Sequence, residues 1–412
     1  MTRNQPFPSP LSAGAARVDI TPSDLGGLNA FGPDFLGVHD RLHARALVLD
    51  VGGDVAALVS LDLVEVGDTS EVRARVEREL GIPADRVLLA PSHDHNAPRI
   101  GLVPPGGKAR IPTPESLAYT RTVYEAIVEV IGRARAAVRP VTMAIGAEAV
   151  DVNVCREAWV DGRWTLGYEP DGASDKNLTT VSFTAEDGTV VAVVLNYAVH
   201  STVMLGVRQV SGDLAGAAAA HVEAELGPDT VALWTAGALG DQAPKVQLGT
   251  PTDDAAHDEA FAVAAMQAQG FLLGATAVRL VRHAARPVPV RSLAGSLRVI
   301  PCPARRLEVP PGMEQADVET VDLTLTCLVV GPVALAGVSG EITVPVARAL
   351  ATASPLATTL VVTNANARIG YLPTDESYLR RTQAADGCPI VQGHAASTIV
   401  DGLAGMIEAA LS

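Results

Sequence analysis

Apolar, β-branched runs bounded by turn residues recur along this chain. Several of these runs are apolar at nearly every position, which is typical of strands buried on both faces. Segments with helix-like spacing of apolar and charged residues lie between them. The pattern predicts strands at 44–51, 54–64, 86–92, 179–185, 189–199, 230–237, 323–338 and 359–366, and helices at 69–80, 114–138, 214–226 and 258–285.

Strands that alternate with helices indicate an α/β architecture. The stretch 289–330 instead repeats apolar and polar residues with a period of two, which favours antiparallel pairing. We therefore expect an α/β fold with mixed β-sheets flanked by helices. The chain has no clear internal linker, so we expect one domain over residues 13–405, preceded by an N-terminal extension at 1–12.

Composition and charge limit the classes of partner that the protein can bind. The chain has 412 residues, of which 48% are hydrophobic and 19% are charged, so it can bury a large core. Its 31 basic residues face 46 acidic ones, for a net charge of −15. Nucleic acids and anionic membranes bind basic surfaces. We therefore expect a small-molecule substrate, no nucleic-acid partner and no stable membrane association.

The N-terminus and the cysteines indicate the cellular compartment of the protein. The first twenty residues lack the apolar segment of a secretory signal, and no run approaches the ~20 apolar residues of a membrane span. The four cysteines are widely separated and form no C-x-x-C pair. Reduced, structural thiols in a cytoplasmic protein are the expectation.

The densest group of polar residues follows the predicted strand 86–92. His93 and His95 stand two apart at its carboxyl end, where α/β enzymes commonly place their sites. Residues at this spacing on a strand point to the same side, so both imidazoles could contact the same ligand or metal ion. Imidazole suits zinc, and a catalytic site keeps one position open for water. A pair of ordinary polar histidines is the alternative.

Two more junctions of strand and turn, and the start of one helix, deliver polar residues. His200 ends the run 189–199, where a hydrogen-bonded core histidine is the alternative to a site residue. Asp213 opens a helix and could cap it or orient a ligand. Asp241 lies near the tip of a Gly-rich turn that could approach a ligand closely.

Two further junctions lie near the C-terminus. Glu341 follows the apolar run 323–338. Tyr371 and Tyr378 lie in the Gly/Pro-containing loop after 359–366, where ordinary packing is an alternative for Tyr378. Five strand ends that each carry His, Asp, Glu or Tyr are typical of the way α/β enzymes assemble a site.

These motifs, in this order, resemble the catalytic domain of the neutral/alkaline non-lysosomal ceramidases, and particularly their shorter bacterial relatives. The resemblance spans about residues 13 to 405. It is carried by ARVDITP, GVHDRLHARALVLD, ALVSLDLV, PSHDHNAP, NYAVHSTVM, VSGDLAG, the Gly-Asp turn at 240–241, SGE at 339–341 and GYLPT at 370–374.

The resemblance implies a zinc site and assigns its residues. The metal ligands would be His93, His200, Glu341 and Tyr371. His95 would be a catalytic residue facing the substrate. Arg156 would contact the carbonyl or oxyanion of the substrate, and Tyr378 would be another tyrosine of the active site. Asp241 is the last catalytic candidate, and together with Asp213 it would support the site without touching the metal.

Two departures from the family pattern bear on the substrate. Ceramidases carry a serine in Gly-Asp-Val-Ser-Pro, whereas this chain reads Gly-Asp-Gln-Ala-Pro with Ala243 at the serine position. The chain also ends where ceramidases continue into an immunoglobulin-like domain. Both departures argue against ceramide itself. Without that serine, Ser92, Ser211 and Thr202 are the other candidate nucleophiles.

The leading hypothesis is therefore a zinc-dependent hydrolase of a carbon–nitrogen amide in a small or amphiphilic substrate. Zinc would polarise the carbonyl and lower the pKa of a water molecule toward ~7. A lactone or ester hydrolase, or an enzyme that forms amides by acyl transfer at the same zinc site, is the alternative. A catalytically degenerate, zinc-containing binding protein is a second one.

Overall fold

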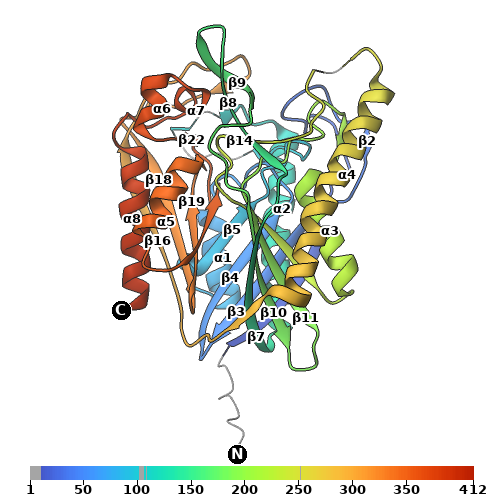
Figure 1. The fold of residues 1–412 in the computed structure, drawn as a ribbon, viewed down its shortest axis with the longest axis vertical. Coiled ribbons are helices and arrows are strands. Elements are labelled where there is room, and N and C mark those ends of the chain that lie inside the picture. Colours follow the sequence, from blue (N-terminus) through green and yellow to red (C-terminus); the bar gives the residue numbers. More distant parts are fainter. Residues whose placement is uncertain (1–10, 102–105, 108, 251) are drawn as a thin grey trace, which may run out of the picture.

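Two β-sheets packed face to face form the centre of the protein, and helices cover their outer faces (Figure 1). The computed structural model describes residues 11–101, 106–107, 109–250 and 252–412. This arrangement confirms the predicted α/β fold with mixed sheets flanked by helices. The expected extension at 1–12 lies mostly outside the described residues, and its last two residues begin the first strand.

The larger sheet has nine strands, in the order β13-β11-β10-β7-β1-β3-β4-β5, with β15 paired to β7. Most neighbours are antiparallel, but β4 pairs with β5 and β11 with β13 in parallel. The strands are β1 (Leu11–Asp19), β3 (His43–Val51), β4 (Asp54–Leu61), β5 (Val87–Pro91), β7 (Arg139–Ala149), β10 (Asn177–Ala185), β11 (Val190–Tyr197), β13 (Val231–Ala236) and β15 (Arg286–Val288).

The second sheet has four strands, in the order β16-β18-β19-β21. Its long antiparallel pair, β16 with β18, confirms the pairing predicted for 289–330. β19 and β21 are parallel. The strands are β16 (Leu293–Pro303), β18 (Thr320–Val330), β19 (Val333–Val338) and β21 (Thr358–Thr363).

The core between the sheets consists of aliphatic side chains from both. Leu47, Leu58 and Leu88 of the large sheet belong to the same buried cluster as Leu328 and Leu335 of the small one. Burying one such side chain contributes roughly 1.5–3 kcal/mol. Many small and medium-sized apolar side chains therefore fill this layer in place of aromatic ones.

Helices form three further apolar layers with the outer faces of the sheets. α1 and α2 cover the β1–β5 half of the large sheet, α3 and α4 cover its β10–β13 half, and α5 and α8 cover the small sheet (Figure 1). The helices are α1 (Ser70–Leu80), α2 (Pro114–Ala136), α3 (Asp213–Leu226), α4 (Ala255–Arg279), α5 (Val344–Ala353), α6 (Asp375–Arg380), α7 (Gln383–Asp386) and α8 (Ala395–Leu411).

Helices α5 and α8 were not among the predicted elements. α8 nevertheless carries an apolar stripe at helical spacing, in which Ala395, Ile399, Leu403 and Ile407 are buried. α5 begins with Pro345 in its first turn, a position that favours helix initiation.

Helix α4 is the one helix of the described residues that is long and apolar enough to cross a membrane by length and composition, over Ala255–Ala284. The expectation that no segment approaches such a span does not hold for α4. Half of its most apolar window is buried inside the protein. Gly270 and Gly274 face α3 so closely that an added Cβ would lie 2.5 Å from Ala217 and 2.8 Å from His221. Packing between two helices therefore accounts for the buried half of this apolar window.

Short strand pairs beyond the main sheets hold the loops at their upper end in Figure 1. They include a three-stranded sheet in which β8 pairs with both β14 and β9. The strands are β2 (Gly37–Val38) with β12 (Gln209–Val210), β6 (Ala109–Arg110) with β17 (Met313–Glu314), β8 (Asn153–Val160) with β9 (Arg163–Glu169) and β14 (Gln242–Pro244), and β20 (Glu341–Ile342) with β22 (Tyr371–Leu372).

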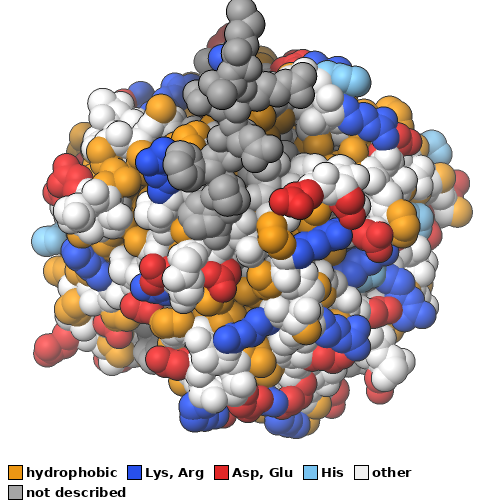
Figure 2. Space-filling model, turned by 90° about the horizontal axis from the view of Figure 1, so that it is seen from below, with side chains coloured by type: hydrophobic (Ala, Val, Ile, Leu, Met, Phe, Trp, Pro, Cys, Tyr) orange, Lys and Arg blue, Asp and Glu red, His pale blue; other side chains and the backbone are white. Residues whose placement is uncertain are grey.

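Surface charge is mixed on the face shown in Figure 2. Lys and Arg side chains there alternate with Asp and Glu side chains, and apolar side chains are scattered among them. This face therefore does not offer the continuous basic surface that a nucleic acid would bind.

Candidate active site

The carboxyl ends of four strands supply the predicted metal ligands. His93 follows β5, His200 follows β11, Glu341 follows β19 and Tyr371 follows β21. The parallel pairs β4/β5, β11/β13 and β19/β21 direct these ends toward one side of the sandwich. The pairing of β20 with β22 then sets Glu341 directly beside Tyr371.

Three imidazoles and one carboxylate converge at this place. Nitrogen atoms of His93, His95 and His200 lie within 4.8 Å of one another. Glu341 Oε2 lies 3.5 Å from His93 Nε2 and 3.3 Å from His200 Nε2. His95 Nε2 lies 3.3 Å from His93 Nε2. The predicted cluster of His93, His200 and Glu341 is therefore formed, and His95 joins it at the edge.

Backbone contacts bring the two histidine loops together. The His95 N–H donates to the Ser201 carbonyl at 3.1 Å, and Asp94 and Ser201 form an isolated parallel bridge. His93 has a φ of 61°, a left-handed conformation that is uncommon for a residue with a side chain. Such strain is found at functional sites, and here it turns the chain between β5 and the loop that carries both imidazoles.

Hydrogen bonds fix the orientation of two imidazoles. His93 Nδ1 lies 2.9 Å from the Val64 carbonyl, and His200 Nδ1 lies 2.9 Å from the Gln242 carbonyl. His93 Nδ1 also lies 3.1 Å from the Asn364 side-chain amide nitrogen. A carbonyl oxygen only accepts, so His200 Nδ1 carries the proton and His200 Nε2 presents its lone pair to Glu341. This arrangement of an anchored Nδ1–H and a free Nε2 is the one that metal-binding histidines adopt.

Glu341 is fully buried and is held as a carboxylate by its neighbours. Burial alone would raise the pKa of Glu341, but His93 and the Arg368 guanidinium hold that pKa well below its ordinary value. Arg368 donates from Nε at 2.9 Å and approaches with Nη2 at 2.8 Å, and both contacts are to Oε1. Oε2 therefore remains free to face the imidazoles.

Two of the three imidazoles, those of His200 and His95, are held neutral. Burial, followed by the charge of Arg156, lowers the pKa of His200 to about 3. Burial and the neighbouring His93 likewise hold the pKa of His95 well below its ordinary value. A carboxylate that faces neutral nitrogen lone pairs is an environment suited to a cation.

Tyr371 and Arg156 form a second group beside this cluster. Arg156 on β8 donates from Nη2 to the Tyr371 hydroxyl at 2.8 Å and to the Gly240 carbonyl at 2.9 Å. Its Nε is buried and has no hydrogen-bond partner among the described residues. Burial raises the pKa of Tyr371, while the charge of Arg156 opposes this. The predicted contact residue Arg156 is thus brought to the site.

Asp241 supports the segment that carries Glu341. Its carboxylate accepts the Val344 N–H with both oxygens, at 3.0 and 3.2 Å, and thereby caps the first turn of α5. The Gly240 N–H donates to the Ile342 carbonyl at 2.9 Å, so the same turn grips the residue after Glu341. Burial raises the pKa of Asp241 to about 7. Asp241 is thus a positioning residue in this geometry.

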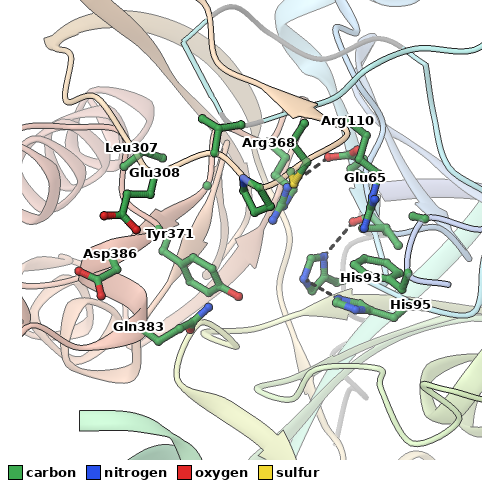
Figure 3. Close-up of a pocket in the computed structure, with 18 of the residues that line it drawn as sticks. Glu65, His93, His95, Arg110, Leu307, Glu308, Arg368, Tyr371, Gln383 and Asp386 are labelled. Atoms are coloured by element: carbon green, nitrogen blue, oxygen red, sulfur yellow. Dashed lines mark hydrogen bonds and ion pairs between the residues drawn. The ribbon is translucent and has the colours of Figure 1, made fainter. Parts of the chain in front are cut away.

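A cavity of about 890 Å³ opens above the histidines. Phe31 stacks on the His95 ring with 4.2 Å between ring centroids. Tyr371 lies on the opposite wall, with its hydroxyl directed toward the histidines, and Gln383 lies beside it (Figure 3). Among the described residues that line the cavity, none is Ser, Thr or Cys.

Several predicted residues lie elsewhere. The Tyr378 hydroxyl donates to the Ile390 carbonyl at 2.8 Å and its ring packs against the core of the small sheet, so Tyr378 does not line the cavity. Asp213 is buried at the start of α3, where it accepts the Met204 N–H at 3.0 Å and the Leu214 N–H. Local packing and capping account for both residues.

The candidate nucleophiles also lie outside the cavity lining. The Ser211 hydroxyl donates to Asp40 Oδ2 at 2.6 Å, Ser92 is buried, and the Thr202 hydroxyl lies 3.4 Å from Gln247 Oε1. Ala243 is buried on β14 in the pair with β8.

Three residues of the site were not predicted from the sequence. Arg368 lies three residues before Tyr371 in the same polar turn, and Glu65, which follows β4 by four residues, lies 3.5 Å from its Nη1. A search for charged residues near the other strand ends would have found both. Phe31 lies in an irregular loop far from the motifs, and no local pattern indicates its stacking on His95.

Comparison with known proteins identifies the family and the fold. Residues 12–267 match the family model described as neutral/alkaline non-lysosomal ceramidase, N-terminal, which confirms the family resemblance seen in the sequence. The structure is similar to that of the neutral ceramidase from Pseudomonas aeruginosa, with a TM-score of 0.78 and 20% identity over 97% of this chain and 75% of that one. It is equally similar to a structure described as ceramidase complexed with C2, with a TM-score of 0.78 and 18% identity over 97% and 76% of the two chains. No match is found among curated proteins.

Proposed function

This chain belongs to the neutral/alkaline non-lysosomal ceramidase family, and we propose that it is a zinc-dependent hydrolase that cleaves a carbon–nitrogen amide bond in a small or amphiphilic substrate. Family membership supports a hydrolase. The observation that carries the finer proposal is the convergence of two imidazole Nε2 atoms on Glu341 Oε2 below an open cavity.

The donor set fits zinc. His200 Nε2 and Glu341 Oε2 are buried atoms without a hydrogen-bond partner in the described part of the chain, a costly arrangement that a cation would relieve. Two imidazoles and a carboxylate are a common ligand set for catalytic zinc. His93, His200 and Glu341 would hold the ion, with Tyr371 as the fourth ligand. When bound, zinc supplies a Lewis acid for the carbonyl and lowers the pKa of water toward ~7.

The chain's own residues supply the remaining functions. Arg156 carries an unpartnered, buried Nε and is already held by Tyr371 and Gly240, so it can donate to an oxyanion that develops on the substrate carbonyl. His95 lies at the floor of the cavity, 3.3 Å from His93, and is fixed by Phe31. We assign to it the transfer of a proton to the leaving amine.

The volume of the cavity supports the proposal of a small substrate. Its volume of about 890 Å³ lies within the range of roughly 300–1,000 Å³ that is typical of sites for small molecules. With Ala243 at the family's serine position, ceramide is not the substrate that we propose. A cytoplasmic location belongs to the same proposal, and it is supported by four buried cysteines, all of them unpaired.

The proposal is tested by metal content and turnover together. We expect one zinc per purified chain, and hydrolysis of at least one member of a panel of short N-acyl amino acids, N-acyl amines and lactams. A chelator should abolish this hydrolysis and added zinc should restore it. Protein that takes up no zinc, or a loaded protein that cleaves no amide of the panel while it cleaves esters, would contradict the proposal.

A further inference from the structure

The cavity wall is more basic than the chain as a whole. Among its described lining residues are six arginines but only three acidic residues, although the chain has a net charge of −15. The acidic residues Glu308 and Asp386 lie together with Tyr371 on one wall, whereas Arg110, Arg368 and Glu65 lie on the wall next to His93 and His95 (Figure 3). The wall that borders the candidate metal site thus carries two labelled arginines and one labelled carboxylate.

Two of the arginines already have partners that explain them. Arg368 contacts Glu341 and Glu65, so its charge is offset by two carboxylates. Arg305 donates to the carbonyls of Cys388 and Ala385 and covers the Tyr378 ring at 5.3 Å. Neither guanidinium is free to receive a ligand without losing a contact.

Arg99 and Arg110 differ from these. Among the described residues, neither guanidinium makes an ion pair, and Arg99 Nε is buried without a hydrogen-bond partner. Arg110 covers the Phe31 ring at 5.3 Å, and Phe31 in turn stacks on His95. Burial, followed by the charge of Arg99, lowers the pKa of Arg110. Both half-buried guanidinium groups line the same cavity, and an anion bound between them would be stabilised by both charges.

We propose that Arg99 and Arg110 bind a carboxylate of the substrate, one aromatic ring away from His95, so that the preferred substrate is an amide with a carboxylate near the scissile bond. Guanidinium groups bind carboxylates through paired N–H donors, which fixes orientation as well as charge. The short connection through Phe31 places the anionic group close to the reacting carbonyl. This inference rests on the proposed amidase function and specifies its substrate.

The experiment compares two substrates that differ only at this group. N-hexanoylglycine carries a carboxylate, and N-hexanoylethanolamine carries a neutral hydroxyl at the same end. We expect kcat/KM for the carboxylate to be at least tenfold higher. Arg99→Gln and Arg110→Gln should each raise KM for N-hexanoylglycine tenfold or more, while kcat/KM for N-hexanoylethanolamine stays within about twofold.

Controls separate this effect from a general loss of charge or of folding. Arg298→Gln removes an exposed arginine on β16 that does not line the cavity, and should leave both substrates unaffected. Because Arg110 makes no ion pair among the described residues, Arg110→Gln should unfold at the same temperature as the parent protein. An equal loss on both substrates in Arg110→Gln would overturn the inference while leaving the amidase proposal intact.

The remaining outcomes are also decisive. If no amide of the panel is cleaved, the amidase proposal fails, and calorimetric titration of N-hexanoylglycine into the full chain then tests the inference alone. Binding that Arg110→Gln abolishes supports the anion site, and no binding overturns it. Tighter binding of N-hexanoyl-aminomethylphosphonate than of N-hexanoylglycine would overturn the assignment to a carboxylate.

Discussion

The Arg156 guanidinium donates a hydrogen bond of 2.8 Å to the Tyr371 hydroxyl, although the two residues are 215 positions apart in the sequence. β8 carries the arginine and β22 carries the tyrosine, so the contact closes the site across two small sheets. A guanidinium only donates, and its charge therefore favours the ionised phenol. The pair links the residue proposed to hold the metal to the residue proposed to hold the oxyanion.

This link predicts different losses for its two members. Tyr371→Phe removes a proposed ligand and should weaken zinc affinity by at least the roughly 10–100-fold that the loss of a residue supporting a ligand costs. Arg156→Gln leaves all four proposed ligands in place, so zinc affinity should change only a few-fold, while kcat falls about 10²–10³-fold through the lost oxyanion contact. Competition with a chelator and steady-state kinetics measure the two quantities. Tyr168→Phe, on exposed β9, is the matched control. Unchanged zinc affinity in Tyr371→Phe would remove the tyrosine from the ligand set.

Substitution of the buried ligands should affect zinc content and folding stability to different extents. His93→Ala and His200→Ala should reduce zinc from one per chain to near zero, measured by elemental mass spectrometry. Glu341→Gln should do the same and should also lower the free energy of unfolding by about 3–5 kcal/mol, because Arg368 then loses its closest carboxylate. The exposed His257→Ala is the control and should retain zinc. Full zinc content in His200→Ala would contradict the proposed site.

Local signals in the sequence marked His93, His200, Glu341 and Tyr371 as candidate site residues, and the family resemblance assigned them as metal ligands. Each follows an apolar run that ends in a turn, and that pattern depends only on neighbouring residues. The distances among these residues depend instead on strand pairs that are far apart in sequence, such as β11 with β13 and β19 with β21. The sequence therefore predicted the residues of the cluster but not its geometry.

Tyr378 shows the same limit. Tyr371 begins β22 and Tyr378 lies in the short helix α6, but both belong to one Gly/Pro-containing stretch without clear periodicity, so nothing local distinguishes the one that lines the cavity from the one that packs on the small sheet. Asp213 caps the start of α3 and holds the preceding turn, which is one of the two roles that its position before a helix predicted. Helices α5 and α8 were overlooked even though their apolar spacing is present in the sequence.

The raised pKa of Asp241 predicts a pH dependence of stability. Its folded-state pKa of about 7 lies above the ordinary value of 3.8, so between these values the folded protein keeps a proton that the unfolded chain has released. The free energy of unfolding should therefore fall as the pH rises from about 4 to about 7, and then level off. Asp241→Asn keeps an acceptor for the Val344 N–H and removes the titration.

Urea unfolding at pH 5 and pH 8 measures this effect. The difference in stability between the two pH values should be smaller in Asp241→Asn than in the parent by an amount on the order of 2–4 kcal/mol. Asp241→Ala should in addition lose about 0.5–2 kcal/mol at both pH values, because the first turn of α5 loses its cap. An identical pH dependence in the parent and in Asp241→Asn would show that Asp241 is ionised throughout.

The composition of the cavity wall predicts hydrolysis without an acyl-enzyme. Ala243 provides no hydroxyl at the serine position of the family, and the described residues that line the cavity include no Ser, Thr or Cys. Ser211 is held by Asp40, and Ser92 lies in the buried turn before His93. Water is then the remaining nucleophile, and the leaving amine should appear without a pre-steady-state burst. Removal of a catalytic nucleophile typically lowers kcat by roughly 10⁴–10⁶-fold. Because neither serine is proposed to be the nucleophile, Ser92→Ala and Ser211→Ala should each keep at least about a tenth of the parent kcat. Added hydroxylamine should yield no acyl hydroxamate beyond its direct reaction with the substrate. A covalent acyl adduct on any residue, detected by mass spectrometry of acid-quenched reactions, would show instead that another side chain has taken over the role of the missing serine.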